Sequence, residues 1–71
     1  MFNNTAVKPE IEAKNLMMVE DQAKSELLAA KKSELYASYF QDPALKSCAQ
    51  QLANHHRGNF EALMNYIDSH K

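Results

Sequence analysis

Two long stretches with a helical spacing of apolar residues make up most of this chain, and one turn signal, Asp42-Pro43, separates them. In both stretches apolar residues recur every three or four positions, which is the period of an amphipathic helix. After Pro9 no glycine or proline appears before Pro43, and the good helix formers Ala, Leu, Lys, Glu and Met dominate. The pattern predicts one helix over about 9–40 and a second over about 43–69.

The connection between the two helices is expected at residues 41–43. Asp42 can cap the second helix, and Pro43 suits its first position, where a missing N–H is not needed. The residue before a proline also resists helical geometry, which ends the first helix. Because so short a turn forces neighbouring helices to run antiparallel, the sequence predicts an all-α helical hairpin domain over 9–71. Residues 1–8 show no periodicity and are expected to form a flexible tail.

Each helix is expected to bury one apolar stripe, because successive helical residues turn by about 100°. In the first helix the stripe consists of Leu16, Val19, Ala23, Leu27, Ala30 and Ala37, widened on one flank by Met17, Leu28 and Leu35. In the second helix it consists of Leu45, Cys48, Ala49, Leu52, Phe60, Leu63, Tyr66 and Ile67. Tyr36, Tyr39 and Phe40 are expected to pack the closed end of the hairpin.

Five polar residues interrupt the expected apolar stripes. They are Glu20 and Glu34 in the first helix and His55, His56 and Asn59 in the second. Polar groups inside an apolar stripe need a partner, water or a metal ion.

These polar residues allow more than one interpretation. Histidine and carboxylate ligands suit iron, manganese or zinc, so His55, His56, Glu20 and Glu34 from two copies could form a metal site. Alternatively, Asn59 and the two histidines form a buried polar layer that fixes the register of an assembly. The two glutamates could also lie at helix edges with their carboxylates in water.

Composition excludes several classes of function. The chain has 71 residues and a formal charge of -1 with no basic run, which argues against a nucleic-acid partner. The longest apolar run, Leu16 to Val19, is far too short to span a membrane, and the first ten residues do not resemble a signal peptide.

Cys48 is the single cysteine, so no internal disulfide can form. It lies seven residues from His55, about 10 Å along a helix, too far for a thiolate–imidazole pair. Cys48 is therefore interpreted as a small core residue.

Two helices alone cannot enclose a core, so the sequence predicts association, most simply a homodimer that forms a four-helix bundle. The function expected from this is non-enzymatic: a structural or protein-interaction module without a cofactor. Two alternatives are a metal-binding protein and an adaptor hairpin that docks on the helices of another protein. The residues expected at the interface are Leu27, Leu52, Phe60, Leu63, Tyr66 and Ile67.

The stretch from Leu45 to Ile67, LKSCAQQLANHHRGNFEALMNYI, resembles the second helix of the ferritin-like hairpins of the spore coat F family. The shared features are the Asp-Pro turn, a Leu-basic pair after it and the ending Asn65-Tyr66-Ile67. The resemblance implies a bacterial protein of the cytoplasm or the spore, with coat or other assembly proteins as partners. Related rubrerythrins bind two irons through Glu and Glu-x-x-His motifs. This chain carries His56-Arg57-Gly58-Asn59 at the corresponding place, which implies a hairpin without that di-iron centre.

Overall fold

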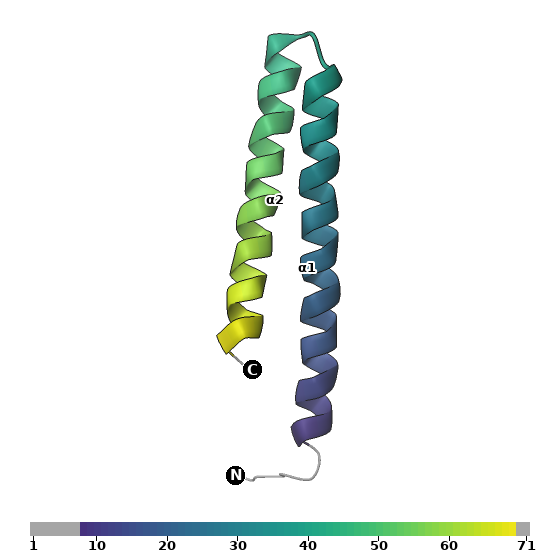
Figure 1. The fold of residues 1–71 in the computed structure, drawn as a ribbon, viewed down its shortest axis with the longest axis vertical. Helices are drawn as coiled ribbons and strands as arrows, with labels where there is room; N and C mark the ends of the chain where they lie inside the picture. Colours follow the sequence, from purple (N-terminus) through teal and green to yellow (C-terminus); the bar gives the residue numbers. More distant parts are fainter. Residues whose placement is uncertain (1–7, 70–71) are drawn as a thin grey trace.

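In a computed structural model the chain forms two helices, α1 (Lys8–Tyr39) and α2 (Pro43–Ser69), which lie side by side and run antiparallel (Figure 1). The structure describes residues 8–69, and the side chains of 12–69. The prediction of an all-α helical hairpin is confirmed. The expected helix bounds were 9–40 and 43–69, so α1 is displaced by one residue at each end. Of the expected tail over 1–8, Lys8 belongs to α1 and residues 1–7 lie outside the described part of the chain.

Asp42 caps α2 as its position before a proline predicts. Its Oδ1 accepts hydrogen bonds from the backbone N–H groups of Ala44, at 2.8 Å, and Leu45, at 3.3 Å. Its carbonyl oxygen accepts one from the N–H of Lys46 at 2.9 Å. These bonds satisfy N–H groups that lack partners at the start of any helix. The local sequence therefore fixes where the chain reverses direction.

Small side chains line the seam along which the helices touch. Ala23, Ala30 and Ala37 recur every seven residues on α1 and are almost fully buried, with Ala30 at 0% exposure. The buried apolar residues of α2 are Ala49, Ala53 and Ile67. Seven-residue spacing keeps one edge of a helix against its neighbour along its whole length, as in a coiled coil. The helices thus pack mainly through methyl groups.

The buried edge of α2 differs from the predicted stripe. Leu45, Cys48, Leu52 and Tyr66 are exposed in the hairpin, whereas Ala53, which the prediction left out, is buried. Cys48 is therefore not a core residue of the hairpin. The prediction centred the stripe on the largest apolar residues, but these lie to one side of the seam that the alanines form.

The flank of α1 and the closed end also differ from expectation. Met17, Leu28 and Leu35 do not widen the buried stripe, because each is at least half exposed. Near the turn, Tyr36 and Tyr39 are exposed and Phe40 is partly buried. The closed end is consequently not packed by the tyrosines within one hairpin.

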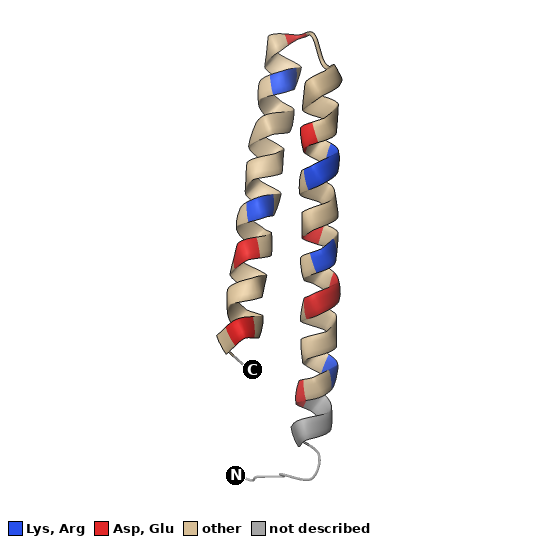
Figure 2. Ribbon diagram, viewed as in Figure 1, with Lys and Arg blue, Asp and Glu red and all other residues tan. Residues whose placement is uncertain are grey.

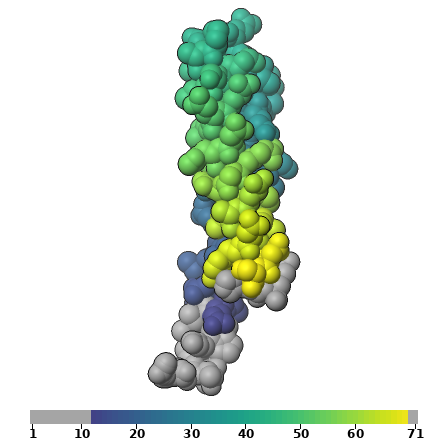
Figure 3. Space-filling view, turned by 90° about the vertical axis from the view of Figure 1, so that its left-hand side faces the viewer, coloured from purple at the N-terminus to yellow at the C-terminus, as the bar shows by residue number. Residues whose placement is uncertain are grey.

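The hairpin is a thin rod, with Cα extents of 57 × 17 × 14 Å (Figure 3). In such a shape every residue lies close to the surface, so two helices leave little interior. Gly58 does not mark a close approach to α1, since a Cβ added there would meet no atom within 4 Å. Neither helix, over the residues described, is long and apolar enough to cross a membrane.

Candidate interaction surface

Side-chain contacts between the helices flank the alanine seam on two opposite sides. On one side Glu26 of α1 meets His56 and Asn59 of α2. On the other side Glu34 of α1 meets Arg57 of α2. At about 100° per residue, Glu26 and Glu34 lie about 40° to either side of Ala30. The rotation of any other residue about its helix axis therefore places it either on the side of Glu26 or on the side of Glu34.

Glu26 is the centre of a polar cluster at the middle of the hairpin. Its Oε1 lies 2.6 Å from Nδ1 of His56 and accepts a hydrogen bond from Nδ2 of Asn59 at 3.4 Å. Its Oε2 accepts one from Nε2 of Gln22 at 3.1 Å. The side chains of Glu26 and His56 are 14% and 25% exposed. A part-buried carboxylate is thus fully hydrogen-bonded within its own chain.

This cluster shifts the titration of the carboxyl group. The hydrogen bond from His56 is the main cause that holds the pKa of Glu26 below its ordinary value of 4.5, and Gln22 and Asn59 act in the same direction. Partial burial opposes them, because it disfavours the charged form. The balance favours the ionised carboxylate in the folded chain.

Because the pKa of Glu26 is lowered on folding, its contribution to stability is present above pH 4.5 and is lost as the pH falls through the lowered value. We expect Glu26→Gln to show a smaller loss of stability between pH 7 and pH 3 than the wild-type chain, measured by urea unfolding at each pH. Glu61→Gln, at an exposed position of α2, is the matched control and should keep the wild-type dependence. Equal pH dependence in all three chains would contradict this role of Glu26.

Glu34 and Arg57 form a two-pronged ion pair on the opposite side. Nε and Nη2 of Arg57 each donate to one carboxylate oxygen of Glu34 at 2.8 Å. The hydrogen bond from Arg57 lowers the pKa of Glu34, and the carboxylate raises the pKa of Arg57. Both side chains are more than 40% exposed, so water screens the pair and it adds little to stability.

The side that contains Glu26 carries most of the exposed apolar side chains of α2. We call it the uncharged face, since Glu26 is the only charged side chain on it among the described residues. Helical rotation places on it Met18, Gln22, Ala29, Ser33 and Tyr36 of α1, and Leu45, Cys48, Leu52, Asn59, Leu63 and Tyr66 of α2, around the pair of Glu26 and His56. In α2 no charged residue occurs between Lys46 and Arg57 (Figure 2).

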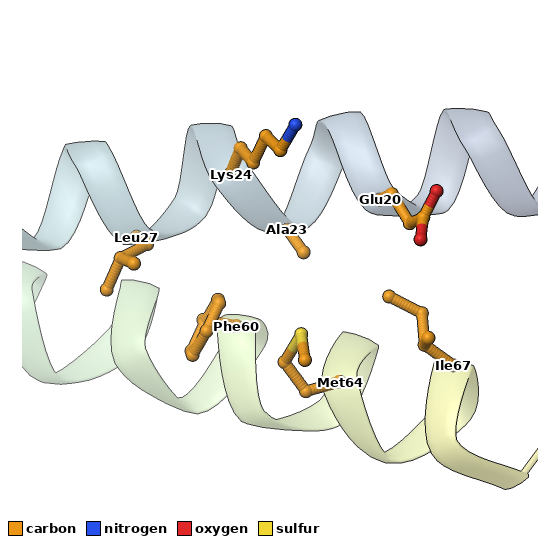
Figure 4. A pocket seen from close by; sticks show the side chains of 7 residues that line it. All are labelled: Glu20, Ala23, Lys24, Leu27, Phe60, Met64 and Ile67. Carbon is orange, nitrogen blue, oxygen red and sulfur yellow. The ribbon is translucent and has the colours of Figure 1, made fainter.

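The opposite side is the charged face. It carries Glu20, Lys24, Lys31 and Glu34 of α1 and Arg57, Glu61 and Asp68 of α2. Near the open end it contains a shallow groove of about 300 Å³, into which Ala23 and Ile67 point, while Lys24 points away from α2 (Figure 4). The charges on this face lie in water, where they need no partner protein.

The four residues considered for a metal site are not gathered within one hairpin. Glu20 lies beside the groove, Glu34 is paired with Arg57, and His55 is exposed, with its ring centre 6.2 Å from that of His56. Among the described residues no three His, Cys, Asp or Glu side chains come together as metal ligands would. Neither glutamate enters the seam, which agrees with their placement at helix edges.

The three residues expected to form a polar layer occupy different places. His56 and Asn59 are part-buried, whereas His55 is exposed. Glu26, which the sequence analysis did not single out, is their partner from α1. Ser33 and Ala53 were missed as buried residues. Counting in alternate steps of three and four from Ala23 would have found Glu26 and Ser33, since the heptad pattern places them on the same edge.

The six residues expected at an interface between copies occupy different places. Leu52 and Tyr66 are about half exposed on the uncharged face, and Leu63 is partly buried there. Leu27 and Phe60 line the groove of the charged face. Ile67, at 3% exposure, is buried between the two helices of its own chain. It contributes to the hairpin itself and has little surface left for a second copy.

Comparisons with known proteins add no family to this description. The chain matches no protein-family model, no curated protein and no solved structure. The likeness to the spore coat F family and to ferritin-like hairpins therefore stays a prediction.

Proposed function

We propose that this chain is a non-enzymatic structural module that works by self-association, two hairpins packing into a helical bundle. The observation that carries the proposal is that small apolar side chains are buried while most of the large ones are exposed. Within residues 12–69, whose side chains the structure describes, five of the six buried apolar residues are alanines, whereas nine large apolar side chains are about half exposed or more.

The energetic argument follows from the size of these side chains. Burying a methyl group contributes about 0.8 kcal/mol, whereas burying a large apolar side chain contributes about 1.5–3 kcal/mol. A single hairpin thus gains little from its seam and leaves its larger apolar groups in water. Association with a second hairpin would bury those that lie on the contact surface, and a role in a larger assembly such as a coat fits a protein of this kind.

The concentration dependence of stability provides the test, because raising the concentration of a self-associating chain favours the folded dimer over the unfolded monomer. We expect the melting temperature, followed by circular dichroism, to rise by roughly 10 °C over a hundredfold increase in concentration. A chain that needs a different partner would be poorly helical at all concentrations, as an adaptor hairpin would be. A cooperative melt that does not depend on concentration would contradict self-association.

A further inference from the structure

We propose that the uncharged face is the surface that contacts a second copy of this chain. The inference rests on the proposed function and deepens it, since it selects one of the two sides of the hairpin. Of the six residues expected at the contact from the sequence, Leu52, Leu63 and Tyr66 belong to this surface around Glu26 and His56, whereas Leu27, Phe60 and Ile67 do not. Its largest exposed apolar members include Met18, Tyr36, Leu45 and Leu52.

Charge distinguishes the two faces as partners for a copy of themselves. In a two-fold dimer each surface meets an identical surface, so every charged side chain that it carries is removed from water in both copies. Apart from the carboxylate of Glu26, the uncharged face offers apolar side chains and uncharged polar groups along its length. The charged face would have to remove at least seven ionised side chains per copy from water, which the mutual attraction of ion pairs seldom compensates.

Glu26 does not prevent this contact, although it lies in the middle of the face. Its two oxygens already accept hydrogen bonds from Gln22 and Asn59, and His56 lies 2.6 Å away. Covering the cluster with a second hairpin would therefore leave no carboxylate oxygen without a partner. A buried polar cluster of this kind can fix how two copies align, because misaligned copies would place it against apolar side chains.

The size of the face is sufficient for a stable dimer. The 27 residues of α2 span about 40 Å along the hairpin. With Cα extents of 14 to 17 Å across, the footprint is about 560–680 Å² before side chains are included. Specific protein–protein contacts bury about 800 Å² on each partner. The uncharged face thus approaches the usual size without any contribution from the charged face.

Thiol protection tests which face is covered. In a chain with Cys48→Ala, a single cysteine is placed at Ala29, on the uncharged face, or at Ala62, on the outer side of α2. We expect alkylation of the cysteine at 29 to slow about tenfold as the concentration is raised through the dimer range. Alkylation at 62 should keep the same rate throughout. The mass of each chain is measured under the same conditions, so that protection is compared with assembly.

A charge placed on either side of α2 provides an independent test. Leu52→Asp should weaken dimerisation about a hundredfold or more, because the carboxylate would be buried without a partner. Asn54→Asp, two residues away and rotated to the other side of the helix, introduces the same carboxylate and should leave the mass unchanged.

The outcomes separate the two proposals. If the wild-type chain is a dimer but the two cysteines react alike and both aspartate variants dimerise, self-association stands and the uncharged face is the wrong surface. If the wild-type chain is a monomer at all concentrations, both proposals fail. Protection at 29 alone, together with loss of the dimer in Leu52→Asp alone, supports both.

Discussion

Replacing Ala53 with aspartate should abolish the folded hairpin. Ala53 is 2% exposed on the alanine seam, where an aspartate has no room, and Arg57, four residues further along α2, is already paired with Glu34. A buried charge without a partner costs about 3–5 kcal/mol, and domains below about 70–80 residues rarely gain more than that from their core. We expect circular dichroism to show a largely unfolded chain at room temperature.

Ala62→Asp is the matched control for this prediction. Ala62 lies nine residues further along α2, about 180° away, and is exposed. The same substitution there carries the same loss of helix propensity but buries no charge, so the chain should remain helical. If both variants were equally helical, the alanine seam could not be the place where α1 and α2 meet.

Replacing Ile67 with alanine should cost about 2–5 kcal/mol of stability, because Ile67 is, among the side chains described, the one large group that the two helices bury almost completely. Urea unfolding is the measurement, and the midpoint should fall while the slope stays the same. Leu35→Ala removes a comparable apolar group from an exposed position of α1 and should change stability by no more than about 0.5 kcal/mol. A larger effect at Leu35 than at Ile67 would mean that the roles of these two positions are reversed.

The parts of the fold that depend on neighbouring residues could be predicted from the sequence. Asp42 and Pro43 act within one helical turn, so the cap and the reversal follow from residue type alone. The long absence of glycine and proline from Glu10 to Asp42 likewise predicts an uninterrupted helix. These local rules gave both helices and their antiparallel arrangement.

The rotation of α2 about its axis could not be predicted in the same way. Residue size favoured Leu45, Leu52 and Tyr66 as the buried edge, yet the helices meet at Ala49 and Ala53. A chain that has two apolar surfaces, one for its own hairpin and one left exposed, gives a single broad stripe in the sequence. Which residues belong to which of these two surfaces is decided by how α1 packs against α2, and that packing depends on the residues of both helices.

The partner of His56 and Asn59 in the polar cluster likewise could not be predicted from the sequence. His56 and Asn59 were expected to need a partner, and Glu26 is that partner from a position 30 residues earlier in the chain. Glu20 and Glu34 were singled out because they interrupt the apolar stripe expected for the first helix. The buried edge of α1 instead passes through Ala23, Glu26 and Ala30.

Sedimentation equilibrium of the purified chain at micromolar concentration tests the central claim most directly. We expect a species of twice the 8.1 kDa chain mass that dissociates on dilution and loses helicity as it does so. A compact monomer of 8.1 kDa that melts cooperatively at the same concentration would contradict the account, because a single hairpin would then be stable with its large apolar side chains in water.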